Sequence, residues 1–250
     1  MPDALAVRLA AAGLDWLVPD WPAAQCVRAF STTRNGVDGE AADLSRRRTV
    51  ASATRAQLSA LLPSEPVWLA QVHGATVCDA DSVGTTAPRA DAAVSRTAGT
   101  VCAVLSADCL PVLFADRGGS VVAVAHAGWR GLAAGVLEAT VDAMHVAAAS
   151  VVAWLGPAIG PEAFQVGAEV LDAFCADDPA AKACFVADSE GKWRADLYSL
   201  ARRRLARAGV AAVCGGGRCT YTESGAFYSY RRGGEGASAR MATLIWIDPA

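Results

Sequence analysis

Histidine is scarce in this sequence, with only three among 250 residues. The supply of imidazole metal ligands is therefore small. The eight cysteines include no C-x-x-C pair, which argues against a structural zinc knuckle and against a thioredoxin-type redox motif. Most of these cysteines are expected to be small buried apolar residues.

Charge of either sign is also limited, because charged residues make up 19% of the chain and the net charge is −3. A nucleic-acid partner would need a basic face, so none is expected. No window reaches the roughly 18 uninterrupted apolar residues of a membrane span. The N-terminal segment lacks the basic n-region of a signal peptide. We therefore expect a cytoplasmic protein with reduced cysteines and no membrane partner.

Apolar residues make up 53% of the chain, enough for a sizeable core. Their spacing predicts helices at 4–12, 50–62, 132–147, 168–175 and 196–208, the last with Asp196 as N-cap. It predicts strands at 26–33, 67–72, 76–79, 91–95, 100–106, 111–115, 120–125, 151–155 and 241–247. Residues 34–48 are predicted to form a loop, and 111–125 a hairpin. Because no linker or repeat interrupts the pattern, we expect one α+β domain over residues 1–250.

Two of the three histidines occupy similar positions. His73 and His126 each follow a predicted strand and each precede a small residue, in QVHG and HAGWRG. Cys109 lies between them in the polar notch Ala107–Pro111. Two imidazoles and one thiolate would leave a fourth zinc position open, as in catalytic zinc sites. His145, on the predicted helix 132–147, is expected at the surface.

Two other interpretations of these residues compete with the metal site. In the first, the protein is a Cys–His hydrolase with Cys109 as nucleophile and His126 or His73 as base. In the second, all three residues are structural. The residue pattern by itself leaves the three interpretations open.

Further polar residues surround this constellation. Asp108 could orient a metal ligand, hold a substrate hydroxyl or simply close a turn. Arg130, between a strand and a helix, suits a phosphate or carboxylate, with a surface salt bridge as the alternative. Tyr230 and Arg231, in the segment FYSYRR, suit stacking on a planar ring and pairing with an anion. The alternative is core aromatics beside solvated arginines.

Six motifs in order carry a resemblance to a known family. They are QVHG (71–74), DAAVS (91–95), SADCLPVLFAD (106–116), AHAGWRG (125–131), WLGPAIGPEAFQVG (154–167) and FYSYRR (227–232). Together they resemble the YfiH / laccase-domain (DUF152) family over about residues 26–247. Two departures are the shortened stretch after Thr33 and Glu162 at a position where the family often has cysteine.

The resemblance implies a single-domain, four-layer α/β/β/α sandwich in which His73, Cys109 and His126 bind zinc, with copper as an alternative ion. It also implies phosphorolysis of purine nucleosides (adenosine, inosine, guanosine and methylthioadenosine) and deamination of adenosine. The small-molecule partners would be a purine nucleoside and phosphate. We expect Cys109, His126, Asp108 and Arg130 to be catalytic, Arg130, Tyr230 and Arg231 to bind substrate, and the protein to be a monomer or weak homodimer.

Other labels in that family imply other activities. A copper-dependent polyphenol oxidase of the multicopper type needs about ten histidines, and this chain has three. A single copper ion in the His–Cys–His site could support only a weak oxidase activity. A cytosolic amidase that edits peptidoglycan precursors would use the same three residues, so the sequence does not separate it from the phosphorylase.

Overall fold

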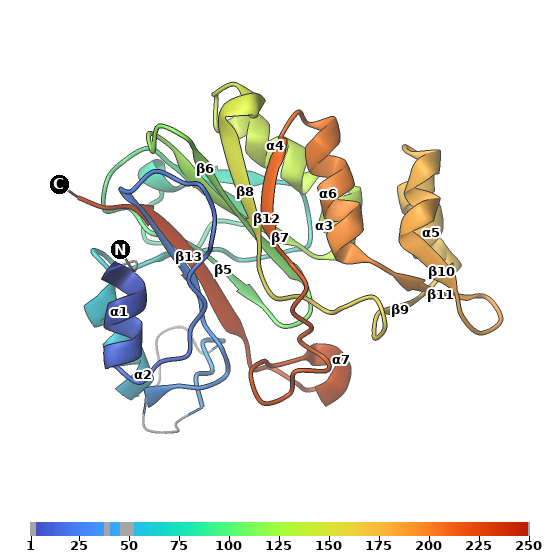
Figure 1. The fold of residues 1–250 in the computed structure, drawn as a ribbon, viewed down its shortest axis with the longest axis horizontal. Coiled ribbons are helices and arrows are strands. Elements are labelled where there is room, and N and C mark those ends of the chain that lie inside the picture. Colours follow the sequence, from blue (N-terminus) through green and yellow to red (C-terminus); the bar gives the residue numbers. More distant parts are fainter. Residues whose placement is uncertain (1–3, 38–40, 46–52, 250) are drawn as a thin grey trace.

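Two β-sheets stacked face to face form the centre of the molecule, in a computed structural model that describes residues 4–37, 41–45 and 53–249 (Figure 1). One sheet has the strand order β1 (Val27–Ser31), β13 (Met241–Ile247), β5 (Cys102–Ser106) and β2 (Val67–Trp68). The other has the order β12 (Ala212–Gly215), β8 (Val151–Leu155), β6 (Leu110–Asp116), β7 (Val122–Ala127), β4 (Ala92–Ser95) and β3 (Val77–Asp79).

Alternate side chains of the central strands fill different parts of the core. In β6, Val112 and Phe114 pack towards the outer helices, whereas Leu113 and Ala115 pack between the two sheets. Every residue of β6 is buried, so no face of this strand meets solvent. A strand covered on both faces produces a continuous apolar run, and β6 reads LPVLFAD.

Helices cover the outer face of each sheet. The helices α4 (Val136–Ala143) and α6 (Leu197–Arg207) pack on the six-stranded sheet. The helices α1 (Ala4–Ala11) and α2 (Ala53–Leu61) pack on the four-stranded sheet. The result is a single-domain α/β/β/α sandwich, which confirms the expected fold. No helix among the described residues is long and apolar enough to cross a membrane.

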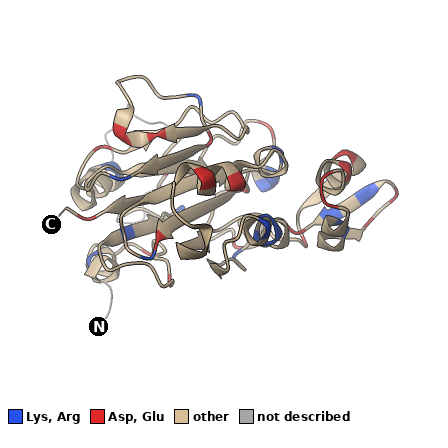
Figure 2. Ribbon diagram, turned by 90° about the horizontal axis from the view of Figure 1, so that it is seen from above, with Lys and Arg blue, Asp and Glu red and all other residues tan. Residues whose placement is uncertain are grey.

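A smaller unit projects from one end of the sandwich (Figures 1 and 2). It consists of β9 (Gln165–Gly167), α5 (Ala168–Cys175), β10 (Phe185–Ala187) and β11 (Lys192–Ala195), with the strands ordered β10-β11-β9. The sequence predicted α5 but none of these strands. Runs of three or four residues are too short to show a reliable alternation.

Several predicted elements agree closely with the structure. The β6–β7 hairpin forms, and Asp196 caps α6 by accepting hydrogen bonds from the main-chain N–H groups of Tyr198 and Ser199. The predicted loop 34–48 and helix 50–62 lie partly outside the described residues.

Other predictions were wrong. The helix expected at 132–147 is divided into α3 (Trp129–Ala133) and α4, because Gly135 adopts a left-handed φ of 89° that a continuous helix cannot contain. Because α4 ends at Ala143, His145 lies beyond the helix, although it is exposed as expected. The strand expected at 67–72 ends after Trp68. Residues 212–215 form a strand that the sequence analysis missed.

Candidate metal centre

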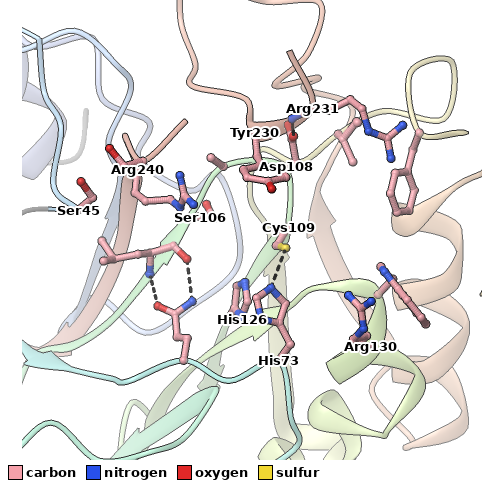
Figure 3. Close-up of a pocket in the computed structure, with 17 residues that line it drawn as sticks. Ser45, His73, Ser106, Asp108, Cys109, His126, Arg130, Tyr230, Arg231 and Arg240 are labelled. Carbon is pink, nitrogen blue, oxygen red and sulfur yellow. Dashed lines mark hydrogen bonds between the residues drawn. The ribbon is translucent and has the colours of Figure 1, made fainter. Parts of the chain in front are cut away.

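The structure brings His73, Cys109 and His126 together at one end of the six-stranded sheet (Figure 3). Their ligand atoms all lie within 4.8 Å of one another. The Sγ of Cys109 is 3.9 Å from Nε2 of His73, and the two imidazole centroids are 4.9 Å apart. Three residues separated in the sequence thus present two nitrogens and one sulfur to a common point.

Strand pairing and a glycine explain how two of these residues approach. Leu110 of β6 pairs with Ala127 of β7, so Cys109 and Gly128 are adjacent where the hairpin strands end. A Cβ on Gly128 would lie 2.9 Å from Sγ of Cys109 and 2.9 Å from Cδ2 of His73. Such contacts are too short, so the absence of a side chain at 128 leaves the space that the centre occupies.

His73 lies in a tight turn rather than at a strand end. Its φ is +61°, an uncommon conformation for a residue with a side chain. The turn is held by Asp91, whose carboxylate accepts hydrogen bonds from three consecutive main-chain N–H groups, those of Val72, His73 and Gly74 (3.1, 2.9 and 2.8 Å). Asp91 is fully buried.

The same carboxylate also orients His126. Nδ1 of His126 lies 2.9 Å from Oδ1 of Asp91. Because the carboxylate can only accept, Nδ1 carries the proton, which leaves Nε2 to face the centre. The sequence analysis missed this role of Asp91, although the residue stands just before β4 in the DAAVS motif and a polar residue at a strand end was an available signal.

These contacts perturb the ionisation of the centre. Burial by itself would raise the pKa of Cys109, but His126 and His73 outweigh it and lower the pKa to about 6. Burial opposes the charge on His126, but the Cys109 thiolate and Asp91 outweigh it and raise its pKa. Burial would likewise raise the pKa of Asp91, yet hydrogen bonds, chiefly from His126, hold it below the usual range. The thiol is thus converted towards thiolate, the form that binds metals or attacks electrophiles.

Asp108 fastens a distant segment of the chain beside Cys109. Its carboxylate accepts hydrogen bonds from Oγ1 of Thr220 (2.6 Å), Oγ of Ser229 (3.0 Å) and the main-chain N–H of Arg231 (2.6 Å). Its φ is +90°. The carboxylate that holds the two histidines is that of Asp91, whereas Asp108 holds the start of α7 (Tyr230–Gly233) over the centre.

A cavity of about 710 Å³ opens above the centre. Its lining includes all the residues predicted from the sequence to form the site, namely His73, Asp108, Cys109, His126, Arg130, Tyr230 and Arg231. It also includes residues that the sequence analysis missed, among them Gln71, Phe164 and Arg240. Gln71 and Phe164 lie within the QVHG and WLGPAIGPEAFQVG motifs, which were an available signal, whereas nothing local in the sequence marks Arg240.

Each arginine of the cavity lies over an aromatic ring. The guanidinium carbons of Arg130, Arg231 and Arg240 are 4.4, 5.6 and 6.0 Å from the ring centroids of Trp129, Phe164 and Tyr230, respectively. No described carboxylate makes an ion pair with any of these arginines. Arg130 is therefore not engaged in a surface salt bridge to the described residues. The helix α3 that carries it has only five residues.

The donor set fits a metal ion. Two imidazole nitrogens and one thiolate sulfur are ligands that zinc takes in tetrahedral sites, and copper also favours them. Because the cavity adjoins all three residues, such an ion could be reached by a small molecule. Asp91 supplies the buried hydrogen-bond partner typical of a metal-binding histidine.

A four-layer α/β/β/α sandwich with a His–Cys–His centre at the sheet end defines a laccase-domain protein. The chain belongs to the family described as "Multi-copper polyphenol oxidoreductase laccase", which matches residues 31–248. The resemblance inferred from the motifs is thereby confirmed.

Named relatives and a solved structure agree with this membership. The chain is 48% identical over 242 residues to a protein of Pseudomonas aeruginosa named purine nucleoside phosphorylase, covering 93% of this chain and 98% of the relative. It is 47% identical over 248 residues to the purine nucleoside phosphorylase YfiH of Escherichia coli, covering 92% and 98%. The crystal structure of a Neisseria meningitidis DUF152 protein matches with a TM-score of 0.85 and 45% identity, covering 94% of this chain and 100% of that one.

Proposed function

We propose that this chain is a metal-dependent purine nucleoside phosphorylase of the cytoplasm. One observation carries the proposal, namely that a single cavity combines a His–Cys–His centre with arginines lacking carboxylate partners among the described residues. Two relatives of nearly equal length and about half-identical sequence bear the same activity in their names. The expected substrates are adenosine, inosine, guanosine and methylthioadenosine, and the expected assembly is a monomer or weak homodimer.

His73, Cys109 and His126 would hold the ion, which we assign as zinc with copper as the alternative. Zinc in such a set supplies a Lewis acid. Asp91 holds the two histidines in place for it. A multicopper oxidase is not proposed, because three histidines cannot supply its ligands.

Phosphorolysis breaks the bond between C1′ of the ribose and a purine nitrogen and forms a bond between C1′ and a phosphate oxygen. The base leaves with the electron pair and takes up one proton. We assign phosphate binding to Arg130 and Arg231, whose side chains line the cavity beside Cys109. Tyr230 and Phe164 supply ring faces for the purine. The carboxylate of Asp108 keeps Arg231 in position by accepting a hydrogen bond from the main-chain N–H of Arg231.

We propose adenosine deamination as a companion activity, in which the oxygen of water replaces the 6-amino group and ammonia is released. A second candidate function is an amidase acting on a peptidoglycan precursor. It is favoured by the thiolate character of Cys109 beside two histidines, the arrangement of a Cys–His hydrolase.

The test is to incubate the zinc-loaded protein with adenosine, with and without phosphate, and to separate adenine, inosine and hypoxanthine by chromatography. We expect phosphate-dependent adenine release that Cys109→Ser and His126→Ala both lose. Cys175→Ser, on the remote helix α5, is the matched control and should keep full activity. Inosine formed without phosphate supports the deaminase.

No turnover by folded, zinc-loaded wild type would contradict the purine assignment. Release of an amino acid from a muramyl-peptide amide by that same preparation would instead support the amidase.

A further inference from the structure

The charge of the cavity is larger than binding of one inorganic phosphate requires. Among the described residues, three arginines line it, and the one carboxylate in the lining, that of Asp108, is already engaged by Thr220, Ser229 and the main chain of Arg231. Arg204, by contrast, is neutralised by Glu138 and Asp177. The cavity arginines therefore present their charge to a ligand.

These arginines occupy two positions around the centre. Figure 3 draws Arg130 and Arg231 on one side of Cys109 and the histidines, and Arg240 on the other, with Ser45 and Ser106. Arg130 comes from α3, Arg231 from α7, and Arg240 from the residue just before β13. The proposed phosphate site uses the first side and leaves Arg240 without a role.

Arg240 is held in a fixed orientation. Its Nη1 donates hydrogen bonds to the carbonyl oxygens of Ala237 and Ala239, both at 2.9 Å, and its main-chain N–H donates to Asp43. Its guanidinium also lies over the ring of Tyr230. Nε and Nη2, the pair that makes a side-on bidentate contact, have no hydrogen-bond partner among the described residues. A preorganised guanidinium with a free edge suits a phosphate group.

We propose that Arg240, supported by Tyr230, forms a second anion subsite, and that the preferred substrate is a purine nucleoside carrying its own phosphate on the ribose. The purine part of this inference rests on the proposed function. Inorganic phosphate occupies the side of Arg130 and Arg231, and the substrate's phosphate occupies the side of Arg240. A phosphate monoester carries about −1.5 to −2 charges at pH 7, which the extra guanidinium partly neutralises.

The test measures equilibrium binding to the zinc-loaded full chain by calorimetry. The probes are the carbocyclic analogues of adenosine, adenosine 5′-monophosphate and adenosine 3′-monophosphate, whose bond to the base is not cleaved by phosphate, each without and with saturating inorganic phosphate. We expect one monophosphate to bind about tenfold or more tightly than adenosine, since a charge-assisted contact is gained. This preference should persist in phosphate and disappear in Arg240→Gln. In Arg240→Lys it should fall to an intermediate value, because lysine keeps the positive charge but cannot make the bidentate contact.

Arg34→Gln is the matched control. Arg34 also lies over a tyrosine ring, that of Tyr228 at 5.2 Å, and donates to a main-chain carbonyl, but it does not line the cavity. Its replacement should leave the preference unchanged.

Three results would overturn the proposal: monophosphates that bind no tighter than adenosine, a preference abolished by inorganic phosphate, or a preference retained in Arg240→Gln. The first would mean that the substrate is a plain nucleoside, and the second that both phosphates share one site. Because turnover is not the readout, a monophosphate preference without phosphorolysis would contradict the proposed function while supporting the second subsite.

Discussion

The two ends of the β6–β7 hairpin use the same structural device for different purposes. At the turn, the carboxylate of Asp116 accepts hydrogen bonds from the main-chain N–H groups of Gly118, Ser120 and Val121. At the open end, Asp91 accepts three main-chain N–H groups of the His73 turn. Both aspartates are buried. A buried carboxylate that closes a turn is thus not in itself a mark of function.

Asp91 differs from Asp116 by one further contact. Asp91 also holds Nδ1 of His126, whereas the carboxylate of Asp116 bonds, among the described residues, only to the turn and to the hydroxyl of Ser120. Each end also has a crowded glycine: a Cβ at Gly118 would meet only the Asp116 carboxylate, but a Cβ at Gly128 would meet Cys109 and His73. The comparison teaches that an ordinary turn becomes a site when its carboxylate and its glycine also serve the ligand residues.

The largest effect is expected from Gly128→Ala. The added methyl would lie 2.9 Å from both Sγ of Cys109 and Cδ2 of His73, so these side chains must separate. We expect loss of bound metal and of turnover, with a stability cost of only about 1–3 kcal/mol from overpacking. Elemental analysis of the purified protein and thermal unfolding measure the two effects.

Gly118→Ala is the control at the other end of the hairpin, where the added methyl would lie 2.9 Å from Oδ2 of Asp116. It should reduce stability and leave metal content intact. Equal metal loss in both variants would show that the crowding at Gly128 acts through general unfolding.

Asp91→Asn should have the next largest effect. The amide nitrogen cannot accept a hydrogen bond, so the His73 turn loses acceptors and His126 is held less firmly. Loss of such a partner typically costs about 10–100-fold in metal affinity. Competition with a chromogenic zinc chelator measures that affinity. Asp116→Asn, matched in burial and in main-chain contacts, should be destabilised without a change in metal affinity, and a similar fall in both variants would refute the distinction between the two ends.

Asp108→Asn should give the smallest effect, and this effect should be on substrate binding rather than on metal binding. The asparagine tolerates the positive φ of this position, but it retains only one oxygen to accept from Thr220, Ser229 and Arg231. We expect α7 to loosen, KM to rise about tenfold and metal content to stay unchanged. Steady-state kinetics measure KM, and metal analysis of the same preparation measures the metal content. Metal loss without a change in KM would place Asp108 with the ligands instead.

Local patterns in the sequence predicted much of this architecture. The continuous apolar runs of β5, β6 and β7 identified strands because every side chain of these strands is buried. The cap at Asp196 was predictable because its partners are only two and three residues away. Four short strands, β12 and those of the projecting unit, were missed because three or four residues carry too little pattern to separate a strand from a loop reliably, although β3 and β4 of similar length were predicted.

The residues of the candidate site also fall into those that the sequence could identify and those that it could not. His73, Cys109 and His126 could be selected because the chain has few histidines and because their chemistry is specific. The position of Asp91 at a strand end marked it as a candidate but did not assign its role, since a strand-end aspartate also closes turns, as Asp116 does at the other end of the hairpin. Arg240 was missed because its place in the cavity depends on how β13 packs beside β5.

By itself, the sequence determined most of the strand and helix content, the family and the three residues with metal-binding chemistry. These follow from composition and from contacts between near neighbours. Only the tertiary structure decided that Asp91 joins the His73 turn to His126 across 35 residues, and that Asp108 holds α7 across 123. The physical reason is that hydrogen bonds between distant segments depend on how the sheets stack and pair, and no local pattern of side chains records that arrangement.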